Sequence, residues 1–400
     1  MKDLVLQLLL AFAALDLVTD GLNWNRIRDS KTRAYQLEHL RLGALQTALD
    51  LLFWVIVFHF PLLDILDETL SRQIESPIWQ GAAWLASISL ARSILSLPLS
   101  IYSTFSIEER FGFNRTSRMT FASDRIKGLI LGLSLGVPLL ALLLKFFTQF
   151  GNHAWWIAWI SVTGLSLILS YLAPMIFLPL FNRFTPLPEG ALREAIEAYA
   201  KKEGFAMKGT FVMDGSKRSS KRNAFFTGFG NLKKLVLFDT LIEKHTSDEI
   251  VAIVAHEMGH FKLGHIPRMI LSTVLTQGIL FFLMGQFLAF RDSQRWVTET
   301  FSLAEPTLAG AFLLMGLLYI PLGRALSVLA LYMSRKHEYQ ADTYSKETFH
   351  KPEALIRALR GLEKDHLSHP NPHPIKVWME YSHPPVSARA KALGVSPQES

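Results

Sequence analysis

Cysteine is absent from this 400-residue sequence, and charged residues make up only 19% of it. Without cysteine the chain has no disulfides, no thiolate nucleophile and no cysteine ligands for a metal. Hydrophobic residues account for 50%, and the formal net charge is +7. Because Lys and Arg lie between apolar stretches rather than in one stripe, this charge favours a membrane protein and no nucleic-acid partner.

Apolar stretches long enough to cross a bilayer, which takes about 20 residues, are frequent in this chain. They cover residues 4–22, 42–66, 78–102, 129–150, 154–180, 269–290 and 308–333. Any one could be a buried helix of a soluble enzyme, but all of them together would leave little polar surface. The first could instead be a cleaved signal peptide, which Asp16 and Asp20 argue against. The sequence therefore predicts a mainly α-helical, polytopic membrane protein with seven transmembrane helices.

The loops between these stretches differ in charge, and this difference predicts their sidedness. Basic residues follow the first stretch (Arg26, Arg28, Lys31, Arg33, Arg41) and the third (Arg110, Arg115, Arg118, Arg125, Lys127), whereas acidic residues follow the second (Asp64, Asp67, Glu68, Glu75). By the positive-inside rule, the first, third and fifth loops and the part after the seventh helix are expected in the cytoplasm.

Two polar regions are large enough to carry chemistry, and both fall on the predicted cytoplasmic side. The expected organisation is helices one to five in residues 1–181, a catalytic domain in 182–268, helices six and seven in 269–333, and the rest of the domain in 334–400. Within 182–268, GTFVMDGS and KKLVLFDTL predict strands. Thr246, followed three positions later by Glu249, predicts a capped helix over residues 247–262. A small α+β domain is thus predicted.

The capped helix carries the motif VAHEMGHFKLGH, residues 254–265. His256 and His260 are four apart and lie on one helical face, so both can bind one metal ion. Glu257 points about 100° away and can reach a water there without being a ligand. This is the H-E-x-x-H pattern of zinc peptidases. His265 lies about 500° beyond His260 if the helix continues, which predicts a bystander at the membrane boundary.

A catalytic zinc site needs three protein ligands and an open position, so a third ligand must come from elsewhere. The metzincin pattern is excluded, because Leu263 and Ile266 stand where it requires glycine and histidine. The candidate is SRKHEYQAD, residues 334–342, after the last apolar stretch. Glu338 and Asp342 share a helical face there, which suits a glutamate ligand and an aspartate that bonds a ligand histidine's second nitrogen.

Several stretches together resemble the integral-membrane zinc metalloproteases of the CAAX prenyl protease type. They are YSTFSIEERFGFNRT (102–116), RSSKRNAFFTGFG (218–230), LVLFDTLI, VAHEMGHFKLGH, EYQAD, HPNPHP and YSHPP, in matching order and spacing. The resemblance implies seven helices that enclose a water-filled chamber, capped on the cytoplasmic side by a small zincin-like domain. Lys221 and Arg222 depart from the eukaryotic pattern, in which small or neutral residues are usual.

The resemblance also implies roles for individual residues. His256, His260 and Glu338 are expected to bind Zn²⁺, with Glu257 as general base. Residues outside the helix motif are implied as well: Asn223 to hold the substrate backbone, His383 to stand near the reacting carbonyl, and Arg389 as a basic substrate-binding residue.

The implied activity is zinc-dependent hydrolysis of a peptide or protein substrate, and prenylated or membrane-associated proteins are the candidate substrates. The strand LVLFD could accept an extended substrate on its edge, or it could lie inside the sheet. The expected location is a multi-pass position in a bacterial inner membrane, or in the endoplasmic reticulum of a eukaryote. Two alternatives remain: a quality-control protease, and a transporter or receptor with a structural zinc site. Cobalt or manganese could in principle replace zinc.

Overall fold

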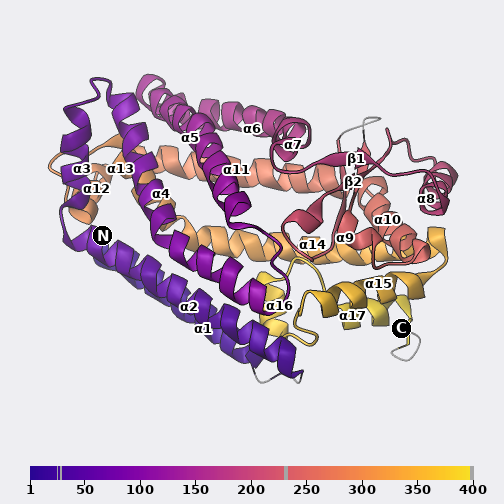
Figure 1. Ribbon diagram of the computed structural model, residues 1–400. Coiled ribbons are helices and arrows are strands. Elements are labelled where there is room, and N and C mark those ends of the chain that lie inside the picture. Colours follow the sequence, from indigo (N-terminus) through magenta and orange to yellow (C-terminus); the bar gives the residue numbers. More distant parts are fainter. Residues whose placement is uncertain (25, 28, 229–232, 397–400) are drawn as a thin grey trace.

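The computed structural model describes residues 1–24, 26–27, 29–228 and 233–396, and long helices dominate it (Figure 1). Arg28, one of the predicted topology-setting residues, and Gly230, the end of a matched run, lie outside the described residues. Among the described residues, 6 helices are long and apolar enough to cross a membrane, or up to 7 with one bent pair. The structure therefore agrees with the predicted polytopic helical fold.

The spans run close to the predicted stretches. They are α1 (Lys2–Trp24), α2 (Ser30–His59), α4 (Pro77–Tyr102) continued by η1 (Ser103–Glu108), α5 (Arg118–Gln149), and α11 (His265–Ala289), together with the segment Gly151–Phe181. That segment consists of η2 (Gly151–His153), α6 (Ala154–Leu172), η3 (Ala173–Phe177) and α7 (Leu178–Phe181). The bent pair is α13 (Leu308–Leu318) and α14 (Ile320–Phe349), which meet at 49°.

The second span begins earlier and ends earlier than the apolar stretch 42–66 predicts. Asp29 caps α2, since its carboxylate accepts a hydrogen bond from the backbone N–H of Thr32 at 2.6 Å. The helix ends at His59, and Pro61 then precedes the short helix α3 (Leu62–Ser71). The apolar stretch predicted neither the start nor the end of α2 correctly. The first turns of α2 are polar, and the last residues of the stretch belong to α3.

The spanning helices leave most of their surface uncovered by one another. In each unbroken span, at most 17% of the apolar window is buried inside the protein. A tightly packed bundle would bury more, so this arrangement fits the predicted helices that surround a chamber. At the end far from the sheet, α3 and α12 (Ser293–Phe301) pack with α13 over a core that includes Trp84 and Phe301 (Figure 1).

A sheet of four strands lies beside the ends of α11 and α14 (Figure 1). Its order is β1-β2-β4-β3, with β1 (Phe184–Pro186) antiparallel to β2 (Thr210–Met213), β2 parallel to β4 (Lys234–Phe238), and β4 antiparallel to β3 (Ala224–Thr227). The LVLFD strand, β4, is thus internal, and the hypothesis of a free edge there is wrong. Among the described strands, β3 is the edge nearest the motif helix.

The motif helix α10 (Ser247–Lys262) is the most buried helix of the chain's polar part. The predicted capping box is present: Thr246 Oγ1 accepts from Glu249 N at 3.3 Å, and a Glu249 carboxylate oxygen accepts from Thr246 N at 3.1 Å. Apolar residues of α10 pack with α8 (Ala191–Lys202), α15 (Pro352–Asp365) and α17 (Val386–Leu393) in one core. The remaining short helices are α9 (Asp239–Ile242) and α16 (Pro374–Glu380).

The helix α10 also packs directly on α14. A Cβ atom placed on Gly259 would lie 3.1 Å from the Ala341 Cα and 3.2 Å from the Tyr344 Cβ. Only glycine allows so close an approach of the two helices. This contact brings the two metal-motif segments, far apart in the sequence, side by side.

Candidate metal centre

Three predicted ligand side chains converge between α10 and α14. One ligand atom from each of His256, His260 and Glu338 lies within 4.8 Å of the others. The two histidine Nε2 atoms are 3.2 Å apart, and the Glu338 carboxylate oxygens lie 3.4 Å from His256 Nε2 and 3.3 Å from His260 Nε2. The helical spacing of four therefore aims both imidazoles at one point, and the contact at Gly259 adds the carboxylate from the second helix.

The chemistry of these donors fits a divalent metal ion. Glu338 Oε2 is buried and has no hydrogen-bond partner among the described residues, although it lies 3.4 Å from His256 Nε2 and 3.2 Å from Arg389 Nη1. Burial would lower the pKa of His256, but hydrogen bonds to Asp342 and Glu338 outweigh it and raise that pKa to about 9. The centre thus favours positive charge, which a metal ion held by two neutral imidazoles and one carboxylate supplies.

Asp342 holds the first ligand histidine from behind. Its Oδ1 lies 2.9 Å from His256 Nδ1, which leaves Nε2 of that ring for the metal. Arg389 donates two hydrogen bonds to Asp342, from Nε at 2.8 Å and from Nη2 at 2.6 Å. A third guanidinium nitrogen, Nη1, lies 3.2 Å from Glu338 Oε2. With 4% of Arg389 exposed, α17 closes the ligand set from a third direction.

Glu257 follows the first ligand on the same helix turn and is half-buried. Burial raises the pKa of its carboxyl, and the nearby His256 and His260 oppose this increase. A carboxylate with a raised pKa is a stronger base than an ordinary surface glutamate, so it takes a proton from water more readily. The position and environment of Glu257 therefore suit a general base.

His383 reaches the centre from the segment between α16 and α17. Its Nε2 lies 3.3 Å from Glu338 Oε1, and its Nδ1 pairs with Ser382 Oγ at 2.8 Å. The side chain is 64% exposed. Since the buried ligands occupy the other side, this exposed ring borders the face from which a substrate can approach.

Comparison with known proteins agrees with this geometry. The family model described as CAAX prenyl protease N-terminal, five membrane helices, matches residues 28–183, and the model of peptidase family M48 matches residues 186–395. The chain belongs to peptidase family M48. It is therefore a metalloendopeptidase, in which five-helix and protease parts of the CAAX prenyl protease type are joined.

Curated M48 relatives match along most of their length. CAAX prenyl protease 1 homolog of Oryza sativa is 35% identical over 91% of this chain and 86% of the relative, and CAAX prenyl protease 1 of Saccharomyces cerevisiae is 36% identical over 80% and 73%. The human homolog is 32% identical over 80% and 74%. The crystal structure of S. mikatae Ste24p superimposes with a TM-score of 0.91 at 29% identity, covering 98% of both chains.

Asn223, for which the resemblance implies a substrate contact, does not join the ligand cluster. It lies exposed at the head of β3, and among the described contacts its Oδ1 accepts only from the adjacent Ala224 N at 2.9 Å. The two cations before it, Lys221 and Arg222, anchor this point. Lys221 donates to Tyr35 at 3.0 Å and lies 3.2 Å from Glu108, while buried Arg222 contacts Asp365.

One residue of the run VAHEMGHFKLGH that the sequence analysis set aside belongs to the centre. The expectation that His265 is a bystander is wrong: it is fully buried, and its Nδ1 lies 3.0 Å from His260 Nδ1. The 500° argument assumed a continuing helix, but α10 ends at Lys262 and Gly264 turns the chain with a φ of +68°. A glycine just after the predicted helix end was the signal that could have found this.

Proposed function

We propose that this chain is a zinc-dependent endopeptidase that cleaves near the C-terminus of prenylated, membrane-associated proteins. The observation that carries the proposal is the convergence of His256, His260 and Glu338 beside Glu257, in a chain similar to CAAX prenyl proteases over most of its length. Two imidazoles, one carboxylate and no cysteine form a ligand set typical of catalytic zinc. Residues 182–268 and 334–400 would act together as the protease domain.

The chain's own residues account for the proton transfers. When bound, zinc supplies Lewis acidity toward the scissile carbonyl and makes water acidic enough to ionise near neutrality. Glu257 takes the proton of the attacking water and delivers it to the leaving amine. His383, exposed beside Glu338, donates a hydrogen bond to the carbonyl oxygen as negative charge develops. Arg389 keeps Asp342 and Glu338 in place and, through Nη1, puts positive charge 3.2 Å from Glu338 Oε2.

Substrate would bind in extended form along β3. This strand pairs only with β4 among the described strands, so its other edge is open to strand addition, and it packs against α10. Asn223 at the head of the strand would hold the substrate backbone with its side-chain amide. The anchors at Lys221 and Arg222 fix this entry point relative to the membrane helices and α15.

The protease domain would face the cytoplasm, because the basic loops fall on its side of the membrane. Location in the endoplasmic reticulum or in a bacterial inner membrane is compatible with this orientation. In either case the prenyl group would enter the chamber between the spans, while the peptide reaches the metal at the chamber's end.

A cleavage assay with a matched variant tests the proposal. Purified wild type and Glu257→Gln are compared for zinc content and for cleavage of a farnesylated CAAX peptide and the same peptide without the lipid. We expect about one zinc per chain in both proteins. We also expect cleavage only by the wild type, with the farnesylated peptide preferred.

Other outcomes separate the alternatives. Equal cleavage of the two peptides would remove the prenyl specificity and favour a quality-control protease. Zinc in both proteins without cleavage of either peptide would overturn the proposed substrate class, and activity restored by cobalt or manganese alone would overturn the choice of zinc.

A further inference from the structure

His265 stands between the second metal ligand and the outer surface of α14. It is 0% exposed. Its Nδ1 lies 3.0 Å from His260 Nδ1, and its Nε2 lies 3.0 Å from Gln340 Oε1. The residues thus form a chain of two hydrogen bonds that starts at the ligand and ends at a side-chain amide.

The acceptor at the end of this chain fixes every proton along it. A carbonyl oxygen only accepts, so His265 Nε2 carries the hydrogen that Gln340 receives. In a neutral imidazole the other nitrogen is then an acceptor, so the hydrogen between the two rings belongs to His260 Nδ1. His260 consequently presents a bare Nε2 to the metal, which is the form that a metal ligand requires.

The surroundings hold His265 in this orientation. The ring of His337 stacks on it, with centroids 4.1 Å apart and an interplanar angle of 13°. His337 is buried, and neither of its ring nitrogens has a hydrogen-bond partner among the described residues. It therefore contributes a flat wall and no hydrogen bond. This difference makes His337 a matched control for His265.

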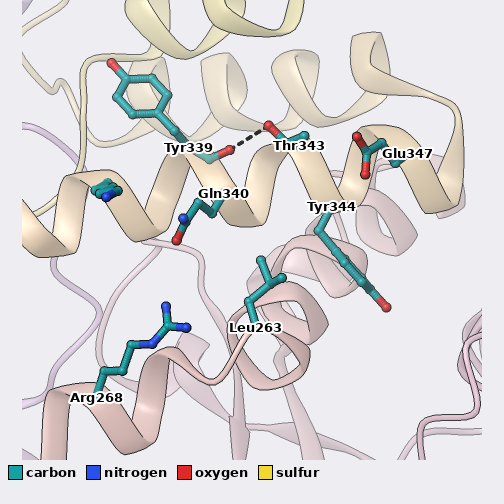
Figure 2. A pocket seen from close by; sticks show the side chains of 8 residues that line it. Leu263, Arg268, Tyr339, Gln340, Thr343, Tyr344 and Glu347 are labelled. Atoms are coloured by element: carbon teal, nitrogen blue, oxygen red, sulfur yellow. Dashed lines mark hydrogen bonds between the residues drawn. The ribbon is translucent and has the colours of Figure 1, made fainter.

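The outer end of the chain lies at a cavity of about 430 Å³ between the α10–α11 turn and α14. Figure 2 shows the Gln340 side chain pointing from α14 toward Arg268 and Leu263, which also line this cavity. Gln340 is partly exposed, so it can be changed with less disturbance of the core than the buried histidine.

We propose that His265 and Gln340 are positioning residues that hold His260 in its metal-binding tautomer, and that the two ligand histidines differ in basicity as a result. A carboxylate, Asp342, stands behind His256, whereas a neutral imidazole stands behind His260. The charged acceptor makes His256 the stronger donor, and the neutral relay leaves His260 weaker, which keeps the bound metal more electrophilic. This inference rests on the proposed metal site.

Metal affinity and the visible spectrum of the Co²⁺-substituted full-length protein test the proposal without any substrate. His265→Phe keeps a ring for the stack but removes both hydrogen bonds. We expect a 10- to 100-fold loss of metal affinity, measured by chelator competition, and a shifted Co²⁺ spectrum. His337→Phe should bind metal like the wild type. His265→Asn places an amide oxygen near the Nδ1 position and should recover most of the affinity.

Gln340→Leu keeps the proposal testable if His265→Phe does not fold. It leaves His265 Nε2 without an acceptor and should lower metal affinity in the same direction by a smaller factor, with the same spectral shift. Unchanged affinity and spectrum in Gln340→Leu and His265→Phe would overturn the proposal, as would an equal loss in His337→Phe. Normal metal binding without peptide cleavage in the wild type would instead count against the proposed function alone.

Discussion

The residue behind each ligand histidine determines how firmly that ligand is held. For His256 this residue is Asp342, which is 1% exposed and also accepts two hydrogen bonds from Arg389. Asp342→Asn keeps the shape and removes the charge. We expect metal affinity to fall about 10- to 100-fold, because the amide is a poorer acceptor for the imidazole and the buried Arg389 guanidinium loses one of its two carboxylate partners.

The control for this change lies on the same helix. Glu347→Gln, at an exposed position of α14, alters the same charge away from the centre and should leave metal affinity unchanged. Chelator competition with both variants gives the comparison. If Asp342→Asn binds metal as tightly as Glu347→Gln, the carboxylate behind His256 has no part in holding the ligand.

Among the individual residues of the centre, the sequence analysis found the two pairs that are spaced by one helical turn. It missed His265, which is not related to the others by helical spacing. His256, His260, Glu338 and Asp342 lie at intervals of four, so one helical turn predicts that each pair shares a face. His265 follows a helix break, and no periodicity places a side chain across such a break. Its partner, Gln340, lies on another helix and became visible only with the packing of α10 on α14.

At the scale of the elements, the contact between α10 and α14 is the feature on which the centre depends. Gly259→Ala would put a methyl group 3.1 Å from the Ala341 Cα, so the helices must separate by a few tenths of an ångström. We expect kcat/KM to fall about 10- to 100-fold, because Glu338 shifts relative to the two histidines. Peptide cleavage together with metal affinity measures the effect.

A glycine without neighbours provides the comparison. Gly316 lies in α13, and a Cβ there would meet nothing within 4 Å. Gly316→Ala should keep full activity and slightly favour the helix. Similar losses in the two variants would show that the close approach at Gly259 is not what aligns the ligands.

The helix α15 carries a carboxyl group that makes stability depend on pH. Burial raises the pKa of Glu363 to about 7, against an ordinary value of 4.5. The folded state therefore holds this proton more tightly, and the stabilisation is present below about pH 4.5 and is lost as pH rises through 7. Glu363→Gln should raise the Tm in detergent at pH 8 and change it little at pH 5.

Thermal unfolding across this pH range checks that expectation. The variant Glu347→Gln, which removes an exposed carboxyl, should follow the wild-type profile. If wild type and Glu363→Gln differ in Tm by the same amount at pH 5 and at pH 8, the raised pKa of Glu363 would be contradicted.

The elements themselves were predictable where a local signal marks them. Thr246 and Glu249 gave the start of α10, and KKLVLFDTL gave β4. The position of β4 within the sheet could not be predicted from the sequence, because strand order depends on pairing between distant segments. The parallel register of β2 with β4 and the antiparallel register of β3 with β4 put it inside. The edge next to Asn223 is β3 instead.

For the whole molecule, length and apolarity were enough to predict seven spans from the sequence. The structure adds the contacts between the spans, including those that bear on the predicted chamber. Asp50 of α2 and Arg92 of α4 form an ion pair at 3.1 Å, with 39% and 45% of their side chains exposed. Ionisable groups within spans usually face a bundle interior or a water-filled cavity. Such a pair fits a wet chamber between the helices.

The absence of cysteine makes this chamber open to a direct measurement. A single Asp50→Cys variant should react with a small charged thiol reagent in liposomes, because water reaches the side chain. Ala158→Cys, at a fully buried position of α6, is the unreactive control. Equal protection of the two positions would mean that Asp50 does not line a water-filled space.

The order in which the parts of the centre occur along the chain has a consequence for biosynthesis. His256 and His260 precede α11, Glu338 and Asp342 follow the bend between α13 and α14, and Arg389 comes later still. During translation, the peptidase cannot be complete until every spanning helix has left the ribosome and entered the bilayer. A chain that stalls before residue 338 therefore lacks the third ligand, and it carries no finished metal centre.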